Sequence, residues 1–461
     1  MDKPVVDMTI DADTIGIYEK EYILHSWTSQ NRFKPFVIAG AKGSYFWDDQ
    51  GKKYLDFASQ LTNVNAGHQH PKVIQAIKDQ AERLCYAVPS AANEQRAELA
   101  KMLIELMPSD LCKVFFTTGG GESNENALKI ARAYTKRHKV IARFRSFHGG
   151  TYGVSSVMGD VRRIASEPGV PGGIRVWDPF CYRCFFKMKY PECDIYCAEA
   201  IRELIEVEGP ETIAAIIVEP ITGSTCRIVS PDSYLQRLRQ ICDDYGIILI
   251  FDEVMTGFGR TGKWFACEHW GVTPDIITLS KGINNGTLPL GAVVINKKIA
   301  DYFEEQILYA GLTQFGNPIA CAAGIASIKV MQEERLVENS RLLGQLLMER
   351  LEEIKQRHIC VGDVRGKGLF AAIELVKDRA TREPLIAWTL KNYENKDPLM
   401  SRLIVELKDM GLFTYTRWNV LFICPPLSIT QEELSWGLDK IDHVLGIADE
   451  HISNHMIMLD I

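Results

Sequence analysis

The chain lacks several features that would place it in a specialised class of protein. Its 461 residues contain no run of 18 or more apolar residues, so we expect no membrane-spanning segment. The residues that follow Met1 lack the apolar core of a secretion signal, and we therefore expect a cytosolic protein. The formal net charge of −7 gives no electrostatic reason to expect a nucleic acid partner. Internal repeats and low-complexity tracts are also absent. What remains is an ordinary globular composition, long enough for more than one domain.

Cysteine, by contrast, is not scarce. The chain has 12 cysteines, which should be mostly reduced thiols in a cytosolic protein. Four of them follow the pattern Cys181-x2-Cys184-x8-Cys193-x3-Cys197, which is close to the spacing of zinc ligands. A cysteine-rich surface excursion without a metal is the alternative. We expect no metal at these residues.

Strand and helix signals alternate through the middle of the chain. The predicted strands are residues 113–116, 139–143, 213–218, 247–251, 276–279 and 291–295, and the predicted helices are residues 122–135, 231–244 and 317–333. This alternation favours a mostly parallel sheet with helices on both faces.

The pattern changes after residue 333. There the sequence predicts helices at 337–357 and 398–410, one glycine-hinged strand at 364–374, a strand at 421–424 and a closing helix from Gln431. This mixed order indicates a second, smaller α+β domain.

Two of the predicted strands lead to ionisable residues. An apolar run ends at Asp252, and another precedes Lys281. In open α/β sheets, ligands bind at the carboxyl ends of the strands. An acid that can pair with a pyridinium nitrogen, together with a lysine that can form a Schiff base, is the arrangement that pyridoxal 5'-phosphate (PLP) requires.

A glycine-rich segment upstream predicts a phosphate site. Residues 115–124 run from a predicted strand into a predicted helix and contain three consecutive glycines, two of which are Gly120 and Gly121. Glycine lets the backbone approach an anion closely, and the free N–H groups at a helix start point toward it. Such a turn can also be a simple tight connection. Its place upstream of Asp252 and Lys281 favours the phosphate site.

The residues from Ile248 to Lys281 resemble the signature of the class III, or ω-amino-acid, aminotransferases, and the resemblance extends over about residues 27–427. It implies the α/β fold of the fold-type I PLP-dependent enzymes, with a mostly parallel sheet of the seven-stranded type in a large domain and a smaller α+β domain. The implied PLP-binding domain is 65–319. Residues 320–461 would form the C-terminal small domain, which the N-terminal segment 1–64 joins. The enzyme would act as a homodimer or a dimer of dimers.

The resemblance also implies the chemistry. An amine donor and a 2-oxo acid acceptor would react in turn, by a ping-pong mechanism. Lys281 is the catalytic lysine that would bind PLP as a Schiff base and then move a proton on the substrate. The full set of cofactor contacts that the resemblance implies is Gly120, Gly121, Phe147, Glu219, Asp252, Val254, Lys281 and Thr313.

Two of these positions would face the cofactor ring. Phe147 would stack on one face, for which any aromatic ring suffices, although on composition alone it would more often be a core residue. Val254, which is β-branched and stiff, would pack on the other face. His148 is expected to orient its neighbours rather than to act as a base.

One of these positions departs from the family pattern, and two keep a second interpretation. Members of the family usually carry Ser, Thr or Val where Gly121 stands, so here only backbone donors would remain. Thr313 matches the threonine that reaches the phosphate across a dimer interface, and its alternative is a turn hydroxyl. Glu219 resembles an acid near the cofactor, and a scaffold role has equal weight.

The expected substrate site includes an arginine, and a nearby position departs from the pattern of some family members. Arg417 resembles the arginine that binds an acidic group of the substrate, and its planar guanidinium suits a carboxylate or another oxyanion. Ornithine- and 4-aminobutyrate-type members carry Glu where Ser224 stands, and use it to mask that arginine. Ser224 cannot form this ion pair, which argues against those two specificities.

The sequence around Trp27 and Arg162 is similar to the taurine aminotransferase subgroup. Arg162 and a Trp N–H could hold the three oxygens of a sulfonate, although loop arginines are usually solvated. The leading hypothesis is therefore taurine with 2-oxoglutarate or pyruvate. The alternatives are a β-alanine, diamine or other ω-amine donor with pyruvate, or an aminomutase, racemase or decarboxylase on the same scaffold.

Overall fold

The computed structural model describes residues 7–108, 110–394 and 397–459, and a seven-stranded sheet forms its centre. The strands in spatial order are β4 (Leu111–Thr117), β10 (Gly291–Asn296), β9 (Ile276–Leu279), β8 (Ile248–Asp252), β7 (Ile213–Val218), β5 (Lys139–Arg143) and β6 (Gly173–Val176). Strand β10 pairs antiparallel with β4 and β9, whereas the pairs from β9 to β6 are parallel. The predicted α/β fold with a mostly parallel seven-stranded sheet is confirmed.

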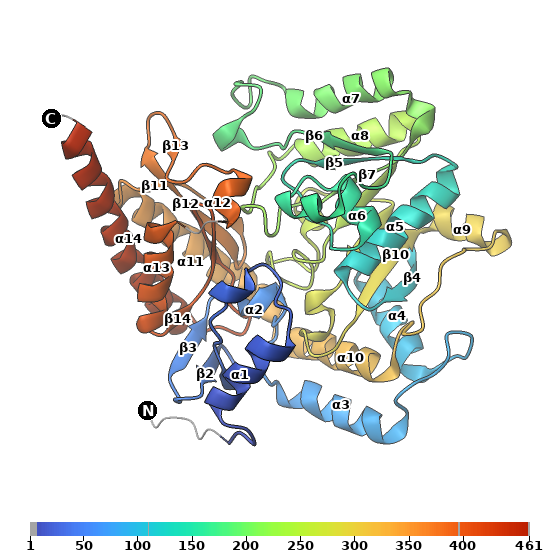
Figure 1. The fold of residues 1–461 in the computed structure, drawn as a ribbon. Coiled ribbons are helices and arrows are strands. Elements are labelled where there is room, and N and C mark those ends of the chain that lie inside the picture. The colour runs from blue at the N-terminus through green and yellow to red at the C-terminus, as the bar shows by residue number, and fades with distance from the viewer. Residues whose placement is uncertain (1–6, 109, 395–396, 460–461) are drawn as a thin grey trace.

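Helices cover both faces of this sheet (Figure 1). On β7, Ala215 and Ile217 belong to the apolar cluster that includes α5, α6 and α9, whereas Ile216 and Val218 belong to the one that includes α7 and α8. Every residue of β7 is buried, which explains its continuous apolar sequence. The helices of this large domain are α3 (Pro71–Arg83), α4 (Glu94–Leu106), α5 (Gly120–Thr135), α6 (Tyr152–Val157), α7 (Tyr196–Glu208), α8 (Tyr234–Tyr245), α9 (Lys297–Glu305) and α10 (Pro318–Glu333).

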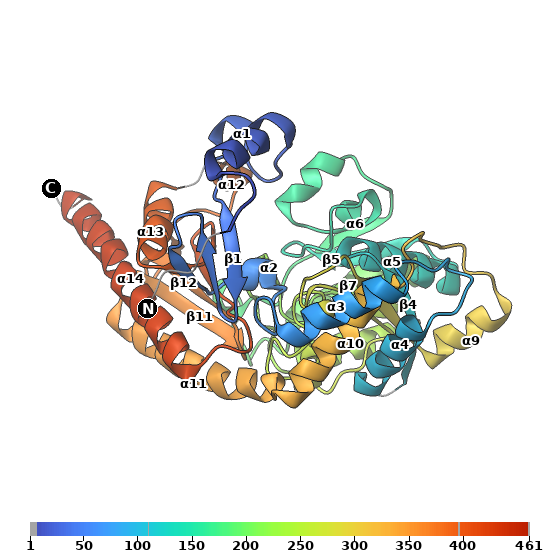
Figure 2. The same cartoon turned by 90° about the horizontal axis from the view of Figure 1, so that it is seen from below.

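The C-terminal part forms the smaller domain around a second sheet, in the order β11-β12-β16-β15 with β13 beside β12. Figure 2 shows α10 and α11 following one another along one side of the molecule, from the large sheet to this domain. Its elements are α11 (Leu336–Arg357), β11 (Val361–Lys367), β12 (Phe370–Asp378), β13 (Glu383–Pro384), α12 (Leu390–Glu394), α13 (Pro398–Asp409), β14 (Leu412–Phe413), β15 (Thr416–Arg417), β16 (Val420–Ile423) and α14 (Gln431–Leu459).

The two ends of the chain meet in a third sheet, in the order β1-β2-β3-β14. Strand β14 pairs parallel with β3, with Leu412 opposite Leu55, so the N-terminal strands lie beside the C-terminal helices (Figures 1 and 2). The N-terminal elements are α1 (Ala12–Tyr22), β1 (Ile38–Lys42), β2 (Tyr45–Asp48), β3 (Lys53–Asp56) and α2 (Ser59–Thr62). The domain boundaries at 64/65 and 319/320 stay predictions.

One predicted element is wrong. Residues 364–374 are not a single hinged strand but parts of β11 and β12, which pair antiparallel with Lys367 opposite Phe370. Gly368, with φ of +57°, lies in the turn between them, in the left-handed region that glycine adopts without a steric penalty. The other predicted strands and helices agree with the structure to within three residues at each end. In the part of the chain that the structure describes, no helix is long and apolar enough to cross a membrane.

Arg260 ties the three parts of the chain together. Its fully buried guanidinium donates to the carbonyl oxygens of Leu369 and Pro425, in the small domain. It also donates to Ser59 Oγ at 3.2 Å and to Asn65 Oδ1 at 2.8 Å, near the N-terminal strands. Buried acceptors that lose their donor carry a desolvation cost, so this single side chain is important for the assembly of the domains.

Replacing Arg260 by methionine should lower the free energy of unfolding by about 3 kcal/mol, because the volume is kept but the buried acceptors lose their donors. Urea denaturation followed by tryptophan fluorescence measures the change. The control is Arg341→Met, which removes an exposed pair with Glu338 on α11 and should leave the free energy of unfolding almost unchanged. Equal losses in the two variants would contradict the role of Arg260.

Candidate functional site

Asp252 ends β8 as a buried carboxylate that is held by three neighbours. Its Oδ2 accepts from Asn124 Nδ2 at 2.7 Å and lies 2.8 Å from Nδ1 of His148. Its Oδ1 accepts from the N–H of Val254 at 3.0 Å. The side chain is only 4% exposed. These hydrogen bonds replace the water that the buried carboxyl group has lost.

Asn124 is a site residue that sequence reasoning missed. Its Nδ2 also donates to the carbonyl of His148 at 2.7 Å, and its Oδ1 accepts from Thr278 Oγ1 at 2.7 Å. It lies four residues after Gly120, in the part of α5 that faces the sheet. The signal was a polar residue at a buried helix position, where an amide needs partners.

Lys281 lies just beyond β9, as the first residue of a 3₁₀ turn (Lys281–Asn284). Its φ of +49° is in the left-handed region, which is uncommon for a residue with a side chain and is often found at functional sites. Burial lowers the pKa of the Lys281 amine to about 8, and the Arg227 guanidinium adds to this effect. The carboxylates of Asp252 and Glu219 oppose it. The structure therefore brings the predicted lysine and acids together.

The glycine turn between β4 and α5 forms a close-fitting cradle. A Cβ on Gly120 would lie 2.8 Å from Cγ1 of Val254, so only glycine fits against that side chain. A Cβ on Gly149, whose φ is +136°, would lie 2.5 Å from Cα of Gly121. The first N–H groups of a helix have no acceptor within the helix, so those at the start of α5 are available to an anion.

Glu219 follows β7 and connects two loops at the same edge of the sheet. Its Oε1 accepts from the N–H of Phe147 at 3.1 Å, and its Oε2 accepts from the N–H of Gly223 at 2.5 Å. Burial raises the pKa of Glu219, and His148 opposes the rise. Glu219 thus holds the backbone of Phe147 in place.

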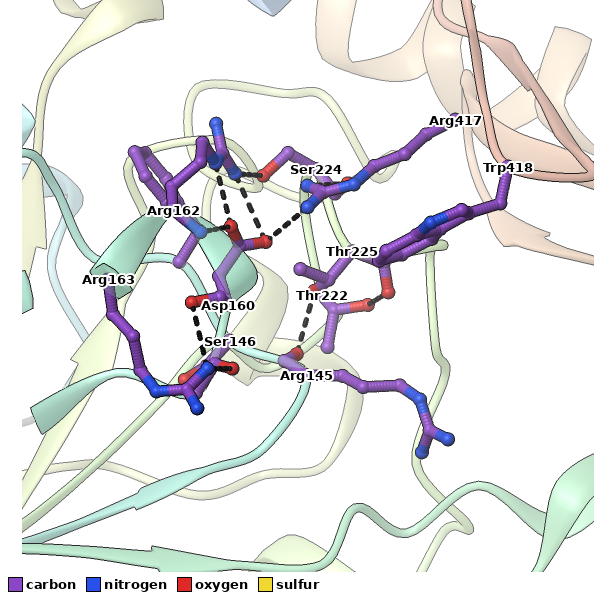
Figure 3. Close-up of polar contacts among 12 residues, drawn as sticks. Arg145, Ser146, Asp160, Arg162, Arg163, Thr222, Ser224, Thr225, Arg417 and Trp418 are labelled. Atoms are coloured by element: carbon purple, nitrogen blue, oxygen red, sulfur yellow. Dashed lines mark hydrogen bonds and ion pairs between the residues drawn. The ribbon is translucent and has the colours of Figure 1, made fainter. Parts of the chain in front are cut away.

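Arg162 and Arg417 meet at one carboxylate, as Figure 3 shows. Asp160 Oδ1 accepts from Arg162 Nε at 2.8 Å, and Asp160 Oδ2 accepts from Arg417 Nη2 at 2.6 Å. Ser224 joins both arginines, because its Oγ accepts from Arg162 Nη2 at 2.8 Å and its carbonyl accepts from Arg417 Nη1 at 2.9 Å. Asp160 is the second residue that sequence reasoning missed. The signal was an acid two positions before a loop arginine, the pattern of a side chain that caps a helical turn.

Arg162 also lies against aromatic rings. Its guanidinium is 3.5 Å from the centre of the Phe147 ring and 5.9 Å from that of Trp27. Cation–π attraction favours both contacts. The predicted substrate residues Trp27 and Arg162 and the predicted ring-stacking residue Phe147 are therefore neighbours.

Thr313 is not brought to this group of residues within one chain. It is exposed, in the turn that precedes α10. Since its predicted contact crosses a subunit interface, that role stays a prediction.

The cysteine cluster lies elsewhere. Cys181, Cys184, Cys193 and Cys197 are free thiols that line a cavity of about 20 Å³. Among the described residues, no group of three or more His, Cys, Asp or Glu side chains is arranged to hold a metal ion. A larger cavity of about 640 Å³, beside the N-terminal helix α1, contains none of the candidate site residues in its lining.

Known proteins are similar to this chain in sequence and in fold. The sequence profile described as Aminotransferase class-III matches residues 28–445. A leucine/methionine racemase from Thermococcus litoralis is 38% identical over 92% of this chain and 93% of its own. A taurine–pyruvate aminotransferase from Bilophila wadsworthia is 33% identical over 94% and 98%, respectively. The crystal structure of a taurine:2-oxoglutarate aminotransferase from Bifidobacterium kashiwanohense, in complex with PLP and glutamate, is 38% identical, covers 97% of this chain and all of its own, and superimposes with a TM-score of 0.91.

In the cofactor-free protein, the Lys281 amine should lose its proton near pH 8, because burial disfavours its charged form. Carbamylation by cyanate and peptide mapping should show half-maximal modification of Lys281 near that pH. The folded-state pKa of about 8 lies below the ordinary value of 10.5, so the charged lysine costs stability below pH 8 and the cost is relieved as the pH rises to 10.5. Lys281→Met should remove that pH dependence. Half-maximal modification above pH 10 would refute the prediction.

Proposed function

The chain belongs to the class III aminotransferases, which depend on PLP, and we propose that it moves an amino group from an ω-amino donor, taurine in our leading hypothesis, to 2-oxoglutarate or pyruvate. The observation that supports an acidic donor is the meeting of Arg162 and Arg417 beside Ser224. Two planar guanidiniums and a hydroxyl suit the three oxygens of a sulfonate. The similarity to a taurine–pyruvate aminotransferase and to a taurine:2-oxoglutarate aminotransferase supports the same donor.

The residues fit the cofactor of this family. Gly120 and Gly121 would hold the phosphate through backbone N–H groups, and Gly120 lies so close to Val254 that a Cβ would be 2.8 Å from its Cγ1, which is consistent with a turn that needs glycine. Asp252, with its three hydrogen-bonding neighbours, would pair with the ring nitrogen. When bound, PLP withdraws electrons from the substrate carbon that bears the amino group.

The protein's own groups would then act on that carbon. We assign the proton transfer to Nζ of Lys281, because its pKa, lowered from 10.5 to about 8, gives it a larger unprotonated fraction near neutral pH than an ordinary lysine has. Glu219 would fix the backbone of Phe147, so that its ring keeps its position beside Arg162. Trp27 would help to enclose the acidic end of the donor.

Two further properties remain proposals. Thr313 would complete the phosphate site from the other subunit of a homodimer or of a dimer of dimers, and its exposure in one chain is consistent with that role. We also propose a cytoplasmic location, as the sequence predicts.

A second candidate function is racemisation of an amino acid, which the 38% identity to the Thermococcus litoralis racemase favours. A β-alanine, diamine or other ω-amine donor with pyruvate is a variant of the first proposal. These alternatives differ in what they consume, because transamination requires a 2-oxo acid and racemisation does not.

A donor panel tests the proposal. Purified protein with PLP should convert taurine at the expense of 2-oxoglutarate or pyruvate, faster than it converts β-alanine or putrescine, and should be inactive without the oxo acid. Product analysis by mass spectrometry measures each reaction, and Lys281→Ala should abolish all of them. Inversion of leucine or methionine without an oxo acid would favour the racemase instead.

Arg162→Ala should reduce kcat/KM for taurine by about a hundredfold, as expected when a charged hydrogen-bonding group is lost, while an alanine-type donor loses little. The control is Arg163→Ala, whose side chain pairs with Glu167 on the same loop. Equal losses for both donors in Arg162→Ala would count against a sulfonate site at this residue.

A further inference from the structure

The contact group of Asp160, Arg162, Ser224 and Arg417 contains more cationic than anionic side chains. Arg162 and Arg417 share the single carboxylate of Asp160, which leaves one net positive charge among the three side chains. The side chain of Arg417 is only 9% exposed, and its Nε is buried without a hydrogen-bond partner. A buried guanidinium is costly unless an anion or acceptor satisfies it, so Asp160 stabilises this arrangement.

Asp160 is held in place from its backbone side. Its N–H donates to the carbonyl of Ser146 at 3.1 Å, and its Oδ1 caps a 3₁₀ turn (Val161–Ser166) by accepting from the N–H of Arg162 at 3.0 Å. The side chain is fully buried. Burial opposes its ionisation, but the guanidiniums of Arg417 and Arg162 hold its pKa below the usual value. The carboxylate is thus a fixed negative charge.

The three groups come from distant parts of the chain. Asp160 and Arg162 belong to the loop after α6, whereas Arg417 ends β15 in the small domain (Figure 3). Ser224, in the loop after β7, contributes a hydroxyl and a carbonyl but no charge. In the described structure, Asp160 is therefore the anion that both arginines contact.

We propose that Asp160 is a specificity-determining residue. Its carboxylate occupies both arginines when a substrate brings no acidic group. It therefore sets how strongly the site prefers carboxylate or sulfonate substrates. The proposal rests on the aminotransferase function proposed above and deepens it. With Asp160 present, one positive charge remains for an incoming oxyanion, and a donor without an acidic group does not leave two unpaired cations behind. Without Asp160, both guanidiniums would attract oxyanions and repel the ammonium group of an acid-free donor.

The test compares the PLP-loaded wild type with Asp160→Asn and Asp160→Ser. Both replacements remove the charge and keep an oxygen that can cap the 3₁₀ turn. If one variant does not fold, the other still tests the proposal. Sulfate, measured by calorimetry and as a competitor of taurine, should bind about tenfold more tightly to either variant. The ratio of kcat/KM for taurine to that for putrescine should rise by a similar factor, mainly through a lower KM for taurine.

The matched control is Asp439→Asn, which removes the acid of a surface pair with Arg350 at 2.8 Å, far from the site in sequence and in the fold. Its sulfate affinity and donor ratio should equal those of the wild type. Unchanged or weaker sulfate binding in the folded Asp160 variants would overturn the proposal. Since sulfate titration does not depend on turnover, it still tests Asp160 if no donor is transaminated, and that result would count against the proposed function alone.

Discussion

The site depends on a negative charge that is kept in the interior at the end of β8. A carboxylate in such a place is stable only if donors replace the water that it has lost, and Asn124, His148 and the N–H of Val254 do so. Asn124 is fixed in turn by Thr278 on β9. The hydrogen bond between Asn124 and this acid therefore fixes the orientation of α5 against the sheet. It also fixes the position of the glycine turn at the start of α5.

Two regions with different electrostatic properties lie at this edge of the sheet. On the Lys281 side, burial and the Arg227 guanidinium make the amine less basic, which suits a group that has to exchange protons. On the Arg162 side, cations are in excess and are shared by one acid, which suits recognition of an oxyanion. Phe147 has its backbone bound by Glu219, whose carboxylate acts on the Lys281 amine, and its ring against Arg162. In the proposed function, this uncharged ring would connect the cofactor site to the substrate site.

Much of this could be predicted from the sequence, for a physical reason. Strands such as β5, β7 and β9 are buried on both faces, so their apolar runs mark their ends clearly, and an ionisable residue beyond such a run stands out. The roles of Asn124 and Asp160 could not be read in the same way. Each acts through a partner that is more than 100 residues away in the chain, such as Asp252 for Asn124 and Arg417 for Asp160, and no local pattern encodes that contact. The hairpin of β11 and β12 was missed because Gly368 can serve either as a hinge or as a tight turn, and only strand pairing decides between them.

The pairing of β3 with β14 has a consequence for how the protein is made. Strand β3 ends at Asp56, but its parallel neighbour β14 begins at Leu412. During synthesis the edge of β3 therefore has to wait until residues 57–411 have left the ribosome, while the intervening large sheet can already assemble. A nascent chain stalled before Leu412 therefore exposes the unpaired edge of β3 to other chains.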